Sequence, residues 1–150
     1  MQTISLQMSF NAPIERLWAM LIDYEGYASF PKIEAARVVT RGADHPAGVG
    51  AVRELRVDGM TFSEQIVEFD PPRRLAYRIT ASRPLKLRHD IGRMELTERD
   101  GRVDLTWSST FAVDVPIVGG LLTYVARFGM ERTFRAILLH VKSIVEQPAK

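Results

Sequence analysis

The spacing of apolar residues predicts that the chain opens with a strand and continues into two short helices. Residues 3–10 alternate in the manner of a half-buried strand, with one apolar face formed by Ile4, Leu6, Met8 and Phe10. Pro13 and Glu15 then indicate the beginning of a helix, because proline suits the first helical turn and an acidic side chain suits its positive end. A second short helix is expected around residues 24–30.

Two Asp-Gly pairs predict hairpins, and each hairpin determines which side chains share a face of the sheet. Asp58-Gly59 is typical of a two-residue turn, so counting back along both strands places Arg53 opposite Glu64. The alternating pattern of both strands agrees with this register, since one face comes out apolar and the other polar. Arg53 and Glu64 are therefore expected as cross-strand neighbours on the apolar face.

The second pair, Asp100-Gly101, defines a longer hairpin in the same way. Its register places Met94 opposite Trp107 and Gly92 opposite Ser109, again on an apolar face.

Extended further, the same register places Asp90 opposite Phe111, near the end of the strand and the mouth of any cavity. It also turns His89 away from the apolar face. We therefore expect Asp90 in solvent and do not favour His89 as a catalytic base. Between the two hairpins lies a further strand with Tyr77 on one face, whose register the preceding Pro71-Pro72 turn leaves open by one residue.

The end of the chain is predicted to be one long helix, from just after Pro116 to about Glu146. Its second half carries an apolar stripe at helical spacing, made of Phe134, Ile137, Leu138, Val141, Ile144 and Val145. Extending this face backwards at 100° per residue places Met130 and Arg127 on the inward side. The first half is apolar nearly all round.

An antiparallel sheet with one apolar face and a long helix with one apolar stripe bury each other when the sheet curls around the helix. The fold class is therefore α+β, as a single domain over residues 1–150. About seven strands are expected, with the two short helices after the first strand.

Composition narrows the functional classes. The absence of cysteine excludes a disulfide scaffold, a thiolate metal site and a cysteine nucleophile, and it suits a cytoplasmic location. A net charge of +2 does not favour nucleic-acid binding. No signal peptide or apolar run of about 18 residues is found, so stable membrane insertion is not expected. No metal-ligand spacing or phosphate-binding loop is present, and no cofactor is expected.

The order of elements and several local segments resemble the START-like (SRPBCC) superfamily with the helix-grip fold, most of all its polyketide cyclase/dehydrase and lipid-transport subgroup. The matching segments span almost the whole chain and are residues 11–18 (NAPIERLW), 23–31 (DYEGYASFP), 50–53 (GAVR), 64–72 (EQIVEFDPP) and 101–107 (GRVDLTW). They specify the fold rather than the chemistry. The resemblance implies an internal apolar cavity between the sheet and the long helix.

Seven residues are the candidate ligand-binding set. Polar members on the apolar faces would orient a ligand, and large apolar members would surround it; the set is Arg53, Glu64, Tyr77, Met94, Trp107, Arg127 and Met130. Arg53 and Glu64 are either a structural ion pair or a polar anchor for the ligand. Arg127 needs a carboxylate partner, a ligand anion or a bend of the helix.

Three functions remain open at this point. The first is binding of a small hydrophobic or amphipathic molecule, such as a lipid, a polyketide or an isoprenoid-like compound. The second is a cyclase/dehydrase enzyme whose cavity acids and bases move protons, with catalytic residues that the sequence does not identify. The third is a partner-binding regulatory module that uses the apolar start of the long helix. The protein is expected to be a monomer or a homodimer.

Overall fold

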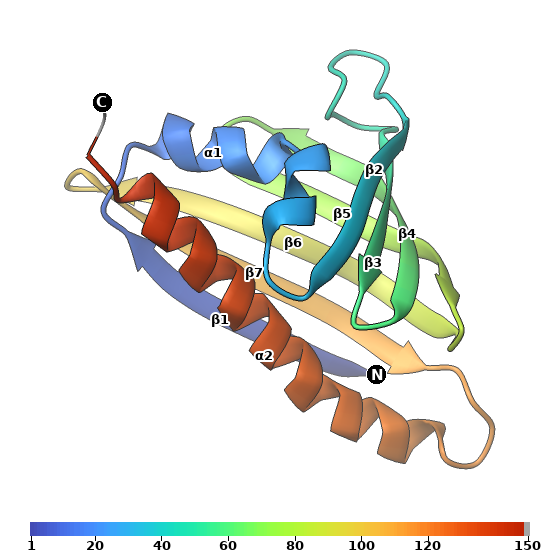
Figure 1. Ribbon diagram of the computed structural model, residues 1–150. Helices are drawn as coiled ribbons and strands as arrows, with labels where there is room; N and C mark the ends of the chain where they lie inside the picture. Colours follow the sequence, from blue (N-terminus) through green and yellow to red (C-terminus); the bar gives the residue numbers. More distant parts are fainter. Residues whose placement is uncertain (149–150) are drawn as a thin grey trace.

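The computed structural model describes residues 1–148, so the last two residues of the expected domain lie outside it. One seven-stranded antiparallel sheet carries a long helix and two short ones (Figure 1). The strand order is β1-β7-β6-β5-β4-β3-β2. In chain order the elements are β1 (Gln2–Phe10), α1 (Ile14–Ile22), the 3-10 helix η1 (Glu25–Ser29), β2 (Ile33–Thr40), β3 (Val52–Val57), β4 (Met60–Asp70), β5 (Arg74–Arg83), β6 (Leu87–Arg99), β7 (Arg102–Val113) and α2 (Gly119–Val145).

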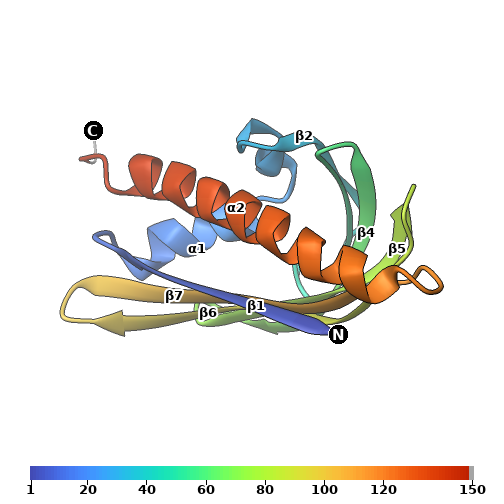
Figure 2. The same cartoon turned by 90° about the horizontal axis from the view of Figure 1, so that it is seen from below.

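The sheet curls around α2, which confirms the expected α+β helix-grip architecture. Figure 2 shows α1 and α2 on the same side of the sheet, with β4 and β2 rising beside α2. Two bulges, one at Thr80 of β5 and one at Val67 of β4, shift the pairing of these two strands. Bulges bend a strand and increase its twist, so they support this curvature. They also settle the register of β5, placing Tyr77 opposite Ile66.

Both Asp-Gly turns form the predicted hairpins. Asp58 and Asp100 have φ values of 48° and 51°, and the glycine after each has a φ of 80° or 76°. Positive φ at both central residues defines the type I′ turn, whose twist matches that of paired strands. The resulting registers place Arg53 opposite Glu64 and Met94 opposite Trp107, as predicted.

The predicted register fails at the beginning of β6. A bulge lies between His89 and Ile91, so His89, not Asp90, is opposite Phe111. One extra residue reverses which side chains face the helix, because side chains alternate along a strand. His89 therefore turns inward, contrary to the prediction, and Asp90 is exposed on the outside.

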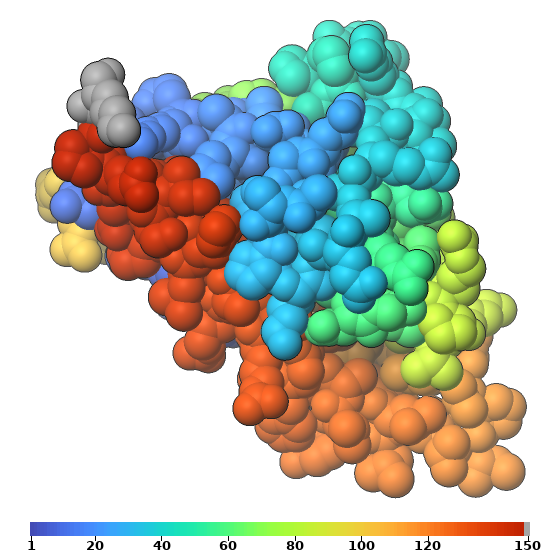
Figure 3. All heavy atoms as spheres, in the orientation of Figure 1, coloured from blue at the N-terminus to red at the C-terminus, as the bar shows by residue number. Residues whose placement is uncertain are grey.

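The two halves of α2 have different surroundings. The second half packs its stripe against β1 and β7, and its buried residues are Phe134, Ile137, Leu138, Val141 and Val145. The first half exposes Leu121, Tyr124, Val125 and Phe128, and it forms one margin of the molecule (Figure 3). Within residues 1–148, no helix combines the length and the apolar character needed to cross a bilayer.

Candidate functional site

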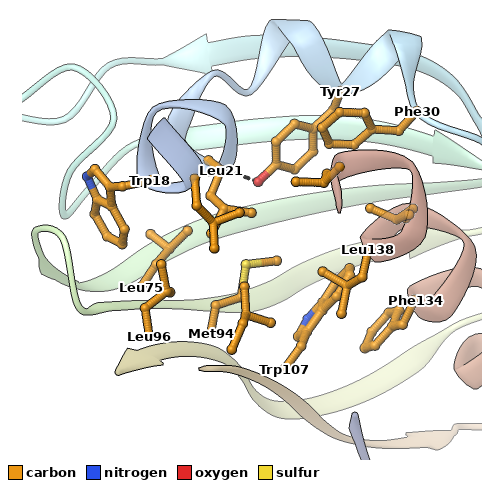
Figure 4. Close-up of a cluster of buried hydrophobic side chains, with 14 of the residues drawn as sticks. Trp18, Leu21, Tyr27, Phe30, Leu75, Met94, Leu96, Trp107, Phe134 and Leu138 are labelled. Atoms are coloured by element: carbon orange, nitrogen blue, oxygen red, sulfur yellow. Dashed lines mark hydrogen bonds between the residues drawn. The ribbon is translucent and has the colours of Figure 1, made fainter. Parts of the chain in front are cut away.

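A cavity of about 310 Å³ lies between the concave face of the sheet and α2. Its wall is mainly apolar, and it includes Leu21 and Phe30 near the short helices, Met94 and Trp107 from the sheet, and Phe134 from α2. The rings of Trp107 and Phe134 stack with their centroids 3.6 Å apart. Figure 4 shows these two residues at one end of the buried cluster, with Trp18, Leu75 and Leu96 together at the other end.

An ion pair lies in the wall of this cavity. Arg53 donates from Nε to Oε1 of Glu64 at 2.9 Å, and its Nη2 lies 2.9 Å from the same oxygen. The two residues are only 2% and 6% exposed. Burial raises the pKa of the Glu64 carboxyl, and the neighbouring Arg53 charge partly offsets that rise. Within the described chain, Oε2 of Glu64 has no hydrogen-bond partner, so it can accept one from a molecule in the cavity.

Three tyrosine rings surround the guanidinium group of Arg53. Its central carbon lies 4.7 Å from the ring centre of Tyr24, 5.2 Å from that of Tyr27 and 4.9 Å from that of Tyr77. Cation–π contact of this kind stabilises a cation that has left water. Arg53 Nη1 also donates to the hydroxyl of Tyr27 at 3.4 Å, and that hydroxyl donates to the carbonyl oxygen of Leu21. The cage fixes the arginine, so its charge is a permanent part of the wall.

Tyr77 also contacts the far side of the cavity. Its hydroxyl accepts a hydrogen bond from Trp107 Nε1 at 3.1 Å. Burial raises the pKa of Tyr77, which keeps the hydroxyl protonated. The residue therefore contacts the Arg53 guanidinium with its ring and β7 with its hydroxyl.

The bulge in β6 brings His89 against this group. Its ring stacks on Tyr77 with centroids 5.7 Å apart, and its Nε2 lies 3.0 Å from Ser109 Oγ. The backbone N–H of Ile79 donates to His89 Nδ1 at 3.0 Å. Burial lowers the pKa of His89 to about 4, so the imidazole is neutral at pH 7.

Six of the seven predicted ligand-binding residues lie in the cavity wall: Arg53, Glu64, Tyr77, Met94, Trp107 and Met130. Their contact with a ligand stays a prediction. Arg127 does not line the cavity. Its Nη1 donates to Gln2 Oε1 at 3.3 Å, and its Nε lies 3.7 Å from Oε1 of Glu131. The long arginine side chain carries its charged end past the cavity wall to Gln2, and the side chain is half-buried, with its Nε buried and without a hydrogen-bond partner within the described residues.

Sequence reasoning did not select Ser109, Tyr27 and Phe134, which also line the cavity. The hairpin register already placed Ser109 opposite Gly92 on the apolar face, so the signal for this residue was present. Its contact with His89 was not predictable without the bulge. Among residues 1–148, no group of three or more His, Asp or Glu side chains is arranged to hold a metal ion.

Several solved structures share this fold. A START superfamily protein from Mycobacterium smegmatis is 16% identical, with a TM-score of 0.74 over 95% of this chain and 98% of that one. The Zhui aromatase/cyclase from Streptomyces sp. R1128 is 21% identical, with a TM-score of 0.80 over 97% and 93%. A protein from Thermus thermophilus is 19% identical, with a TM-score of 0.80 over 96% and 97%. At these identities the likeness shows the fold.

No curated protein matches the sequence. The family described as polyketide cyclase / dehydrase and lipid transport, in contrast, matches residues 1–146. That match covers every helix and strand from β1 to α2. The chain therefore belongs to the polyketide cyclase / dehydrase and lipid transport family.

Proposed function

We propose that this protein binds one small hydrophobic or amphipathic molecule in the cavity, with the polar end of that molecule at Arg53 and Glu64. The observation that carries the proposal is an apolar cavity of about 310 Å³ next to a buried carboxylate with one unpartnered oxygen. Ligand cavities are typically about 300–1,000 Å³ and combine an apolar wall with a few polar groups. The family to which the chain belongs supports the same conclusion.

The site favours a compact and neutral ligand. The cavity volume is at the lower end of the usual range, so one ring system or a single short chain fits better than a two-chain lipid. Arg53 and Glu64 compensate each other's charge, and an additional buried charge on the ligand would have no partner. A hydroxyl or phenol group that donates to Glu64 Oε2 fits this environment.

A second candidate is an enzyme of the cyclase type. Burial raises the pKa of Glu64, which brings its carboxyl closer to the range in which it exchanges protons near neutral pH. The cavity would hold a flexible carbonyl compound in a reactive conformation, and Glu64 would move a proton. Turnover separates the two candidates: an enzyme converts a carbonyl substrate and loses this turnover in the folded Glu64→Gln variant, whereas a binder shows no turnover even in the wild type.

The binding proposal is tested by blocking the cavity from α2. Ala126 lines it, whereas the adjacent Val125 is 58% exposed. We expect native mass spectrometry of the purified wild type to show a bound apolar molecule, or equilibrium dialysis to show binding of 2-acetylnaphthalene. A126W should lose this binding and V125W should keep it. The proposal is wrong if the wild type binds nothing or if A126W and V125W bind equally well.

A further inference from the structure

A row of three paired residues crosses the sheet beneath α2. Tyr77 on β5 is opposite Gly92 on β6, and Gly92 is opposite Ser109 on β7. A Cβ atom on Gly92 would collide with the tyrosine ring and would lie 2.6 Å from its hydroxyl oxygen. The missing side chain therefore lets Tyr77 lie across β6 and brings its hydroxyl to β7, the strand that carries Ser109.

Each hydroxyl in this row already accepts one hydrogen bond. Trp107 Nε1–H can only donate, and it donates to Tyr77 at 3.1 Å. His89 Nδ1 accepts from the backbone N–H of Ile79, so this nitrogen carries no proton. A neutral imidazole then has its proton on Nε2, and Nε2 donates to Ser109 Oγ at 3.0 Å.

Both hydroxyl groups consequently have a hydrogen atom left to donate. A hydroxyl supplies one donor together with its acceptor lone pairs. Within the described chain, the only side-chain hydrogen bonds of the Tyr77 and Ser109 hydroxyls are those that they accept from Trp107 and His89. Their residues are 3% and 1% exposed, and both line the cavity. A molecule in the cavity is thus the available acceptor.

We infer that Tyr77 and Ser109 form a two-donor subsite for a carbonyl oxygen of the bound molecule. The inference rests on the proposed function, and it adds a polar position separate from the Arg53–Glu64 pair. A carbonyl oxygen has two lone pairs and no hydrogen, so it can accept from both hydroxyls. The two donors are neutral, which suits an uncharged oxygen better than an anion.

The two subsites together define a ligand class. Glu64 Oε2 accepts a hydrogen bond from a donor group of the ligand. The Tyr77 and Ser109 hydroxyls donate to a ligand oxygen that carries no hydrogen. The rest of the wall is apolar. A compact hydrocarbon framework with a hydroxyl group at one position and a ketone or aldehyde at another matches all three features.

Two probes of nearly the same shape test the subsite. 2-Acetylnaphthalene carries a carbonyl oxygen where 2-isopropylnaphthalene carries a methyl group. In equilibrium dialysis we expect S109A and Y77F each to weaken binding of the ketone about 3- to 10-fold, the range of a lost hydrogen bond. Binding of the hydrocarbon should change less than about twofold. The infrared carbonyl stretch of the bound ketone should rise in both variants as the hydrogen bonds are lost.

T133V is the matched control. Thr133 also lines the cavity, but its hydroxyl donates to Asp58 Oδ2 at 3.4 Å. This variant should affect both probes equally and leave the carbonyl stretch unchanged. Thermal denaturation identifies any variant that fails to fold. If Y77F fails to fold, S109A alone tests the subsite. Equal losses of the two probes in S109A, or an unchanged carbonyl stretch, would overturn the subsite alone. Failure of the wild type to bind either probe would overturn the proposed function and the subsite together.

Discussion

Two groups of polar residues lie in the cavity wall or, in the case of His89, against it, and they compensate for the loss of water in different ways. On β3 and β4, Arg53 and Glu64 are ionised, and each cancels the charge of the other. On β5, β6 and β7, Tyr77, His89 and Ser109 are neutral, and hydrogen bonds with fixed directions hold them. Loss of one ionic partner leaves a buried charge, whereas loss of one neutral partner leaves a single unmade hydrogen bond. The two groups should therefore differ in their tolerance of substitution.

The largest effect is expected from Arg53→Met. This change leaves the Glu64 carboxylate buried without its counter-charge, which typically costs about 3–5 kcal/mol. Urea denaturation of the purified variant measures the loss in the free energy of unfolding. The double variant R53M/E64L should recover much of it, because no unpaired charge remains.

A surface pair on the same strand is the control for this comparison. Glu54 follows Arg53 in β3, faces the opposite way and accepts a hydrogen bond from Arg37, whose side chain is 66% exposed. Glu54→Gln should leave the denaturation midpoint unchanged, because water screens this pair. If R53M costs no more than E54Q, burial is not what makes the inner pair important.

An intermediate effect is expected from Gly92→Ala in the neutral group. The added methyl group collides with the ring of Tyr77, and overpacking of this kind costs about 1–3 kcal/mol. A double-mutant cycle with Tyr77→Ala measures the coupling by urea denaturation. The cost of Gly92→Ala should fall sharply once the ring is absent, and an undiminished cost would mean that the glycine serves another purpose.

The smallest effect is a pH dependence that arises from His89. Its pKa is about 4 in the folded protein, against 6.5 in a free side chain, because burial disfavours the charged ring. Between these values the unfolded chain binds a proton that the folded chain does not. Stability is therefore fully present above pH 6.5 and falls as the pH falls toward 4. Since water reaches part of the ring, the loss is on the order of 1–2 kcal/mol.

Comparison of the wild type with H89Q isolates this contribution. Unfolding free energies measured from about pH 7.5 to 4 should converge as the pH falls, because the variant has no imidazole to protonate. Both proteins contain the same carboxyl groups, so the contribution of these groups to the pH dependence cancels when one free energy of unfolding is subtracted from the other. Parallel curves for the two proteins would show that the folded and unfolded states bind this proton equally, so that burial does not lower the pKa of His89.

The sequence predicted the ionic group better than the neutral one, for a physical reason. Asp58-Gly59 fixes the register of a short hairpin, and Arg53 lies only five residues before that turn. His89 lies eleven residues before Asp100, beyond a bulge. Each additional residue between a position and the turn is a further place where a bulge can reverse which face the following side chains take. The sequence around Asp90 carries no signal that would predict the bulge there.

The helix shows the same limit in another form. The apolar stripe that predicts the buried side of α2 begins at Phe134, and extending it backwards placed Met130 in the cavity wall. The same extension also placed Arg127 on the inward side. Helical spacing, however, predicts only the direction in which a side chain leaves the helix, and not where the end of a long side chain lies. The length of the arginine let its charged end reach Gln2 instead.

The pairing of β1 with β7 has a consequence for how the protein folds. Gln2 lies opposite Phe111, so the first strand of the chain pairs with a strand more than a hundred residues later. Contacts between residues so far apart form slowly, because the intervening chain must first be ordered. During synthesis, the edge of β1 has no strand to pair with until β7 has emerged from the ribosome, and its apolar face has no cover until α2 follows. We therefore expect closure of this edge to be a late step, with the β3–β4 hairpin able to form earlier.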